Sequence, residues 1–279
     1  MKKIVLLLII SFCIYGFTQK KITWVAIGDS ITYLNDHQDE TGNRLKKGYL
    51  TRVTEKIPGL QYINQGHNGW TSGGIAKEIE NLGLVKADIY SIFLGTNDWW
   101  QGRPVGKISD YQNNTGNHTV FGSFRIIIDK LKQLNKNAEI ILITPMQRSD
   151  FVYINDMTNN AYGSYKEKNN QSLALFADAI KMIGKYEHFP VIDLYNKSGM
   201  TQKNLVKFKR LKDPSNQGTY KNFPYPGFIN IPFDPVHDDY PYPFDAIDMT
   251  YDGLHPSDKG CEVIAKMLVK EIEKLSLNQ

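Results

Sequence analysis

The sequence predicts an α/β protein, a three-layer α/β/α sandwich built on a central parallel five-stranded sheet and decorated with long loop insertions. Two observations predict this fold. Short apolar runs alternate with helical patterns along the chain, as they do in βαβ units. Three of the runs are almost continuously apolar, which is typical of strands buried on both faces of a parallel sheet. The expected strands are Ile22–Ile27, Leu60–Asn64, Asp88–Leu94, Ala138–Thr144 and Pro190–Leu194.

Three amphipathic segments supply the expected helices. In each of them apolar residues recur three or four positions apart, so they form one face of a helix. Ser257 is placed to cap the last of these helices. The apolar faces are Phe121, Phe124, Ile127, Ile128 and Leu131; Leu173, Phe176, Ala177 and Ile180; and Cys261, Ile264, Ala265, Leu268 and Ile272.

Length and composition favour one domain. The chain has 279 residues, of which 41% are hydrophobic and 22% charged, and this is enough for one sizeable core. We expect a single domain over residues 21–279 with a large insertion at 195–250. The net charge is +4, but lysines are spread along the chain, so no nucleic-acid partner is expected. The polar stretches that interrupt the alternation are Thr32–Lys47, Trp99–His118 and Tyr195–Met249.

The N-terminus has the pattern of an export signal. Lys2 and Lys3 precede an apolar run that begins at Ile4, and the run is too short for a stable membrane span. We therefore expect a signal peptide over residues 1–20 and a periplasmic or extracellular protein. A lipoprotein anchor at Cys13 is not expected, because Phe12 before it is too bulky. After removal of the signal, Cys261 would be the only cysteine, which excludes an internal disulfide.

Polar and glycine-rich segments follow the first three expected strands. Ligands bind at the carboxyl ends of the strands in an open parallel sheet. Gly28-Asp29-Ser30 places a serine at a strand-to-helix turn, where helix amides favour developing negative charge. The second strand leads into a glycine-rich loop over residues 64–74, whose N–H groups could approach a ligand closely. The third leads into Gly95-Thr96-Asn97-Asp98, where the Asn97 amide could donate a further hydrogen bond.

A base for the serine is found near the C-terminus. A serine hydroxyl is a poor nucleophile without a base, and imidazole titrates near neutrality. In Asp252-Gly253-Leu254-His255-Pro256 a carboxylate precedes a histidine by three residues, so it could orient the imidazole and stabilise its protonated form. Four such elements in this order predict a shared catalytic site.

The four segments resemble those of the SGNH hydrolases, the GDSL-type esterase/lipase superfamily. The resemblance spans the chain from Ile22 to the last helix. It implies a flavodoxin-like sandwich, with Ser30 as nucleophile, His255 as base and Asp252 as the group that orients the base. It also implies an oxyanion hole made of the Ser30 N–H, the Gly69 N–H and the Asn97 side chain. Gly66 and Gly73 flank Gly69 and are alternatives for its role. Family members need no metal or organic cofactor.

Several further residues are candidates for the substrate pocket. His67 lies in the glycine-rich loop, and two tryptophans follow the Asn97 segment directly. The histidines outside Asp252–His255 show no spacing that suggests a metal site. The pocket candidates are Asp29, His67, Asp98, Trp99 and Trp100.

The expected activity is hydrolysis of carboxylic esters with small acyl groups, on a small molecule or a polysaccharide. Aromatic residues mixed with Asn, Asp and Lys in the insertions suit sugar rings better than acyl chains. O-acetyl groups on carbohydrate are therefore the expected substrate. A lysophospholipase or thioesterase, a sugar O-acyltransferase with the same triad, and a non-catalytic carbohydrate-binding protein are the alternatives. The intact set of Ser30, Asp252 and His255 argues against the last of these.

Overall fold

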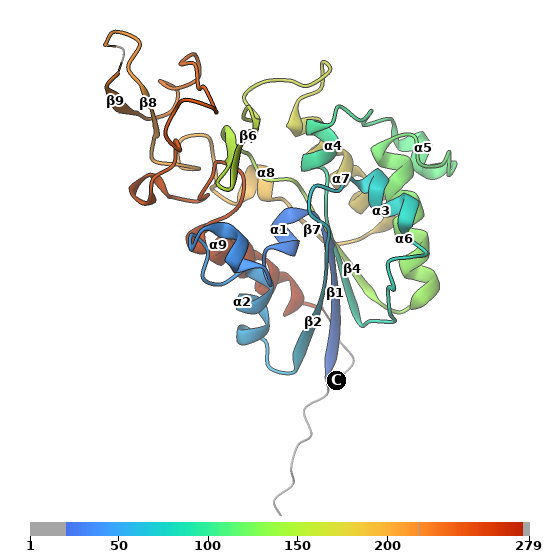
Figure 1. The fold of residues 1–279 in the computed structure, drawn as a ribbon. Helices are drawn as coiled ribbons and strands as arrows, with labels where there is room; N and C mark the ends of the chain where they lie inside the picture. Colours follow the sequence, from blue (N-terminus) through green and yellow to red (C-terminus); the bar gives the residue numbers. More distant parts are fainter. Residues whose placement is uncertain (1–20, 217, 276–279) are drawn as a thin grey trace, which may run out of the picture.

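A computed structural model describes residues 21–216 and 218–275. The expected signal peptide and Cys13 lie outside these residues. A five-stranded sheet with strand order β2-β1-β3-β4-β7 forms the centre, and every neighbouring pair in it is parallel. Helices cover both faces of the sheet (Figure 1), so the predicted α/β/α sandwich is confirmed. Its strands are β1 (Ile22–Gly28), β2 (Leu60–Gly66), β3 (Ile89–Phe93), β4 (Glu139–Ile143) and β7 (Val191–Ile192).

The strands occur where the apolar runs predict them. The last one is shorter than expected, because Leu194 already begins a helix whose first turn is capped by the Asp193 side chain. That carboxylate accepts a hydrogen bond from the Asn196 N–H at 3.0 Å, which ends the strand at Ile192. The helices are α1 (Ser30–Tyr33), α2 (Tyr49–Lys56), α3 (Ser72–Glu78), α4 (Thr96–Trp100), α5 (Ile108–Gln112), α6 (Val120–Leu134), α7 (Leu173–Glu187), α8 (Leu194–Lys197) and α9 (Asp258–Ile272).

Alternating side chains of β1 enter two separate cores. Val25 and Ile27 pack with residues of α3, α6 and α7 on one face of the sheet. Trp24 and Ala26 pack with residues of α2 and α9 on the other face. Because successive strand residues point to opposite faces, a run that is apolar at every position fills both cores. None of the helices found between residues 21 and 275 combines the length and apolarity needed to traverse a membrane.

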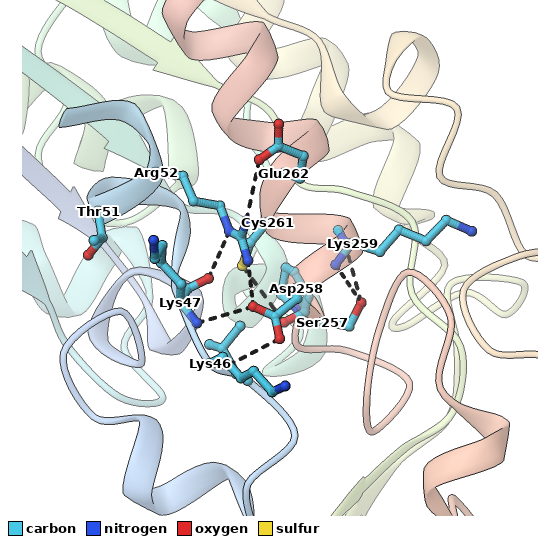
Figure 2. A network of polar contacts seen from close by, with 12 residues as sticks. Lys46, Lys47, Thr51, Arg52, Ser257, Asp258, Lys259, Cys261 and Glu262 are labelled. Atoms are coloured by element: carbon cyan, nitrogen blue, oxygen red, sulfur yellow. Dashed lines mark hydrogen bonds and ion pairs between the residues drawn. The ribbon is translucent and has the colours of Figure 1, made fainter. Parts of the chain in front are cut away.

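A charged network joins α9 to α2 (Figure 2). Arg52 of α2 forms ion pairs with Asp258 and Glu262 in the first turns of α9. The backbone N–H groups of Lys46 and Lys47 donate to the same Asp258 carboxylate, each at 3.2 Å. These contacts hold the start of α9, which lies directly after the segment that contains His255.

Two antiparallel hairpins lie outside the central sheet. The hairpin of β5 (Phe151–Tyr153) and β6 (Asp156–Ala161) follows β4. The hairpin of β8 (Lys209–Lys212) and β9 (Tyr220–Phe223) belongs to the 195–250 insertion. Two short 3₁₀ helices, η1 (Gln38–Thr41) and η2 (Phe244–Ala246), complete the described elements.

The 195–250 insertion is packed on a small core of its own. That core contains Leu211, Phe228 and Tyr242 of the insertion together with Val152 of β5. The Tyr240 hydroxyl also donates to the Val152 carbonyl at 3.1 Å. The aromatic residues of the insertion therefore support the β5–β6 hairpin, beside which the insertion lies in Figure 1.

Candidate active site

Ser30 lies at the sharp turn between β1 and α1. Asp29 caps α1, and its carboxylate accepts a hydrogen bond from the Ile31 N–H at 3.0 Å. A side chain at Gly28 would overlap Thr32, since an added Cβ would lie 2.0 Å from Thr32 Oγ1. Only glycine therefore allows the chain to turn this tightly. The Ser30 side chain is buried, with 6% of its surface exposed.

A continuous chain of hydrogen bonds links Ser30 to Asp252 through His255. His255 Nε2 lies 2.8 Å from Ser30 Oγ, and His255 Nδ1 lies 2.6 Å from Asp252 Oδ2. The other carboxylate oxygen, Asp252 Oδ1, accepts from the N–H groups of Leu254 and His255 at 3.0 and 2.7 Å. Because the carboxylate is held by the backbone of its own turn, it fixes which imidazole nitrogen faces Ser30.

Aromatic rings and a glycine turn hold the imidazole in place. The ring of His255 packs edge-on against Phe151 at 5.4 Å and is stacked with Tyr251 at 5.8 Å. Gly253 has φ +90°, and an added Cβ there would lie 1.8 Å from the Asp150 carbonyl oxygen. The Ser149 N–H donates to the Gly253 carbonyl at 2.8 Å. The segment between β4 and β5 thus fixes the turn between Asp252 and His255.

The glycine-rich loop places Gly69 beside Ser30. A turn closed by the bond from the Trp70 N–H to the His67 carbonyl puts Gly69 at φ +76°. Asn97 Nδ2 donates one of its two hydrogens to the Trp70 carbonyl at 3.0 Å. The second hydrogen of this amide is left for a ligand. Within the described residues, neither the Ser30 N–H nor the Gly69 N–H donates a backbone hydrogen bond. These three groups could therefore donate together to an oxyanion.

Gly66 and Gly73, the two glycines that flank Gly69, pack closely against other segments of the chain. A Cβ on Gly66 would lie 2.1 Å from the Tyr33 nitrogen, and one on Gly73 would lie 2.2 Å from the Arg103 guanidinium carbon. Gly66 is the last residue of β2 and Gly73 lies within α3. Both glycines serve close packing between elements. Of the three, Gly69 alone lines the cavity described next.

A small cavity of about 170 Å³ opens above Ser30 and His255. Its wall combines amide side chains, an indole, a guanidinium and a few apolar groups. The lining residues are Ser30, Asn68, Gly69, Asn97, Trp100, Gln101, Arg148, Phe151, Asn159, Ala161, Leu254 and His255.

Among the five predicted pocket residues, Trp100 lines this cavity. Trp99 is fully buried in the core instead, and its indole N–H donates to the Gln171 carbonyl at 2.9 Å. The ring of His67 stacks on Trp70 at a distance of 4.6 Å. Adjacent positions on the short helix α4 point in different directions, which is why one tryptophan reaches the cavity and the other does not.

The two predicted acidic pocket residues are buried behind the cavity wall. Asp98 accepts hydrogen bonds from the backbone and hydroxyl of Ser72 at 2.8 and 2.6 Å, and Arg103 Nε lies 3.2 Å away. Burial raises the pKa of the Asp98 carboxyl, and the bonds from Ser72 oppose this rise. Burial also raises the pKa of Asp29 to about 6. Both carboxyls brace the loops that carry Ser30 and Asn97.

Four cavity residues come from a stretch that the sequence patterns do not single out. Arg148, Phe151, Asn159 and Ala161 lie in or beside the β5–β6 hairpin. The apolar triplet at residues 151–153 followed by Asn155-Asp156 is a hairpin signal, but it is too short to indicate that the hairpin covers Ser30. Between residues 21 and 275, leaving aside residue 217, no three His, Cys, Asp or Glu side chains cluster as metal ligands do.

Comparisons with known proteins identify the class of protein. Residues 26–215 match the model of the GDSL-like Lipase/Acylhydrolase family. The chain therefore belongs to this family, within the SGNH hydrolase superfamily, and it is a hydrolase of carboxylic esters. The resemblance predicted from the four segments is thereby confirmed.

Among solved structures, the chain is similar to a possible lipase from Chitinophaga pinensis, with 64% sequence identity and a TM-score of 0.91. The match covers 92% of this chain and all of the other. A Lactobacillus plantarum protein has 18% identity and a TM-score of 0.60, over 91% of this chain and 97% of that one. A variant of the Geobacillus acetyl-xylooligosaccharide esterase Axe2 has 18% identity and a TM-score of 0.52, over 93% and 97%. The last two share the fold. No curated protein matches the chain.

Proposed function

We propose that this chain is an exported serine esterase that removes small acyl groups, chiefly O-acetyl groups, from carbohydrate. The observation that carries the proposal is the hydrogen-bonded series Ser30, His255 and Asp252 on the wall of a cavity of about 170 Å³. Lys2 and Lys3 before an apolar run support export.

In the proposed acylation step, Ser30 Oγ attacks the ester carbonyl while His255 Nε2 accepts the hydroxyl proton. Asp252 stabilises the imidazolium, and the Ser30 N–H, the Gly69 N–H and the Asn97 amide donate to the carbonyl oxygen as it becomes negative. The C–O bond to the sugar then breaks, and His255 returns its proton to the leaving alcohol. The acyl group remains on Ser30.

Deacylation repeats the same steps with water. His255 Nε2 removes a proton from a water molecule that attacks the acyl carbonyl. The bond to Ser30 Oγ breaks, the serine regains its proton from His255, and a carboxylic acid leaves. Each step uses the same donors, so one geometry serves both halves of the reaction.

The size of the cavity supports a short acyl group. Pockets for drug-sized ligands span roughly 300–1,000 Å³, and the present cavity is smaller at about 170 Å³. Phe151, Ala161 and Leu254 supply its apolar wall. A lysophospholipase or a long-chain thioesterase would need a longer apolar channel than these residues line.

The polar part of the wall supports a sugar as the alcohol. Asn68, Gln101 and Asn159 are exposed amides around the half-buried indole of Trp100. An aromatic face bordered by amides can stack on a sugar ring and hydrogen-bond its hydroxyls.

The test compares 4-nitrophenyl acetate with 4-nitrophenyl octanoate for the wild type, Ser30→Ala and Ser109→Ala. Ser109 is an exposed serine of α5 outside the cavity, so its replacement is a matched control. Ser30→Ala should lose about 10⁴-fold or more in kcat/KM, and Ser109→Ala should keep full activity. An active Ser30→Ala enzyme would refute the nucleophile. A preference for octanoate would refute the small acyl group, and release of acetate from acetylated xylan would support the sugar substrate.

A further inference from the structure

Arg148 is a buried cation in the wall of the cavity. Only 1% of its surface is exposed, although it lines the cavity above Ser30. Its Nε and Nη2 atoms are buried, and neither has a hydrogen-bond partner among the described residues. A buried guanidinium without acceptors is costly, because its donors have given up water without a replacement.

The backbone of Arg148 is held firmly. Its N–H donates to Ser164 Oγ at 3.0 Å, and its carbonyl accepts from the Ser164 N–H at 2.8 Å and from Gln202 Nε2 at 2.7 Å. The guanidinium carbon lies 5.6 Å from the ring centre of Trp99 and 5.3 Å from that of Trp100. These rings attract the cation but offer no in-plane acceptor for its N–H groups.

The two carboxylates whose charges act on Arg148, Asp252 and Asp150, already have other partners. Asp252 accepts from His255 Nδ1 and from two backbone N–H groups. Asp150 accepts from Lys209 Nζ at 2.9 Å and from the Tyr165 hydroxyl at 2.5 Å. Within the described residues, neither carboxylate forms an ion pair with Arg148.

Arg148 nevertheless remains charged at neutral pH. Burial lowers the pKa of its guanidinium to about 10, and the negative charges of Asp252 and Asp150 oppose this fall.

Arg103 is a partly buried arginine whose guanidinium, unlike that of Arg148, has protein partners. Its Nε also lacks a hydrogen-bond partner among the described residues, but it forms an ion pair with Asp98 at 3.2 Å, and Nη2 donates to the Ser123 hydroxyl at 3.1 Å. Arg148 has no comparable partner, and it faces the space where a substrate must lie. A guanidinium presents its donors in a planar fork that matches a carboxylate.

We propose that Arg148 binds a carboxylate carried by the sugar, so that the substrates are O-acylated acidic saccharides such as esters of uronic acid residues. The inference rests on the proposed function, since it names the substrate class of the same site. A lysine beside the cavity supports this assignment. Lys168 Nζ lies 4.7 Å from the centre of the ring of Trp100, which lines the cavity. Positive charge at the rim would attract an acidic substrate.

The test uses two substrates that differ in one group, a mono-O-acetylated methyl hexuronoside and the corresponding hexoside with CH₂OH in place of the carboxylate. The wild type should prefer the acidic ester by about 10- to 100-fold in kcat/KM, which is the usual range for a charged hydrogen-bonded pair. In Arg148→Gln this preference should disappear through a higher KM for the acidic ester, so that the ratio of kcat/KM for the two esters approaches one. Arg148→Lys, which keeps the charge but not the fork, should be intermediate.

Arg210→Gln is the matched control. Arg210 is an exposed arginine of β8 that also lies over an aromatic ring, that of Tyr220 at 5.8 Å, and it does not line the cavity. This variant loses the same charge and should keep the full preference. A wild type without preference would overturn the proposal. An equal loss of kcat on both substrates in Arg148→Gln would also overturn it, because Arg148 would then act through Asp252.

A binding measurement covers the case in which Arg148→Gln does not fold. Calorimetry of the Ser30→Ala protein with free methyl hexuronoside and methyl hexoside should show tighter binding of the acid. Equal binding would overturn the proposal. This measurement does not depend on turnover, so failure of Ser30 as the nucleophile and failure of acid recognition can be told apart.

Discussion

Asp29 links the geometry of the site to the pH dependence of folding. Its carboxyl is buried next to Ser30, and burial raises its pKa from 3.8 to about 6, although the hydrogen bond from the Ile31 N–H and the nearby imidazole of His255 oppose the rise. Asp29→Asn removes this titration and keeps a side-chain oxygen that can accept from the Ile31 N–H. The substitution therefore isolates the cost of burying the charge.

The sign of the effect follows from the two pKa values. Between pH 3.8 and about 6 the folded state binds the Asp29 proton more tightly than the unfolded state. The free energy of unfolding of the wild type therefore falls as the pH rises through this window, and the full cost is present above about pH 6. The separation of the folded and unfolded pKa values corresponds to a loss of roughly 3 kcal/mol in the free energy of unfolding. About 2 kcal/mol of this develops between pH 4.5 and 7.5.

The assay is urea unfolding of wild type and Asp29→Asn at several pH values, followed by fluorescence of the four tryptophans. The quantity of interest is the difference between the two free energies of unfolding at each pH, because titrating groups that do not interact with Asp29 cancel in it. The stability of Asp29→Asn relative to wild type should rise by about 2 kcal/mol from pH 4.5 to 7.5. A pH-independent offset added to this rise would reflect only the new amide. A difference that stays flat or falls with pH would refute the reasoning.

Four other substitutions test how the site is supported and how it works. Gly253→Ala should lower both the melting temperature and kcat/KM, because the new Cβ would lie 1.8 Å from the Asp150 carbonyl oxygen; a normal melting curve would contradict this. Trp99→Ala should cost about 3–5 kcal/mol of stability in denaturant unfolding, since its ring is fully buried. Trp100→Ala should instead raise KM at nearly unchanged stability. A loss of stability in Trp100→Ala together with a raised KM in Trp99→Ala would show that Trp100 belongs to the core and Trp99 to the cavity. Asn97→Ala should lower kcat for 4-nitrophenyl acetate by about 10²–10³-fold at similar KM, and unchanged kcat would exclude an oxyanion role.

The central sheet could be predicted from the sequence because its strands are buried on both faces. Every position of β3 and nearly every position of β4 faces a core, so the run of apolar residues is itself the signal. The hairpin of β5 and β6 carries no such signal. β5 is short and β6 is mostly exposed, so neither gives a long apolar run. The place of the hairpin over Ser30 depends on contacts with Tyr240 and Tyr242, some ninety residues further along the chain.

The sequence by itself determined which residues stand at the ends of the strands. Parallel strands bring their carboxyl ends to one edge, so Ser30 after β1 and Asn97 after β3 had to meet there. Only the tertiary structure decided what surrounds them. The roles of Trp99 and Trp100 differ because one ring enters the core and the other the cavity, and Arg148 becomes a feature of the site because burial removes its water without supplying an acceptor. Burial depends on the packing of distant segments, which neither periodicity nor spacing records.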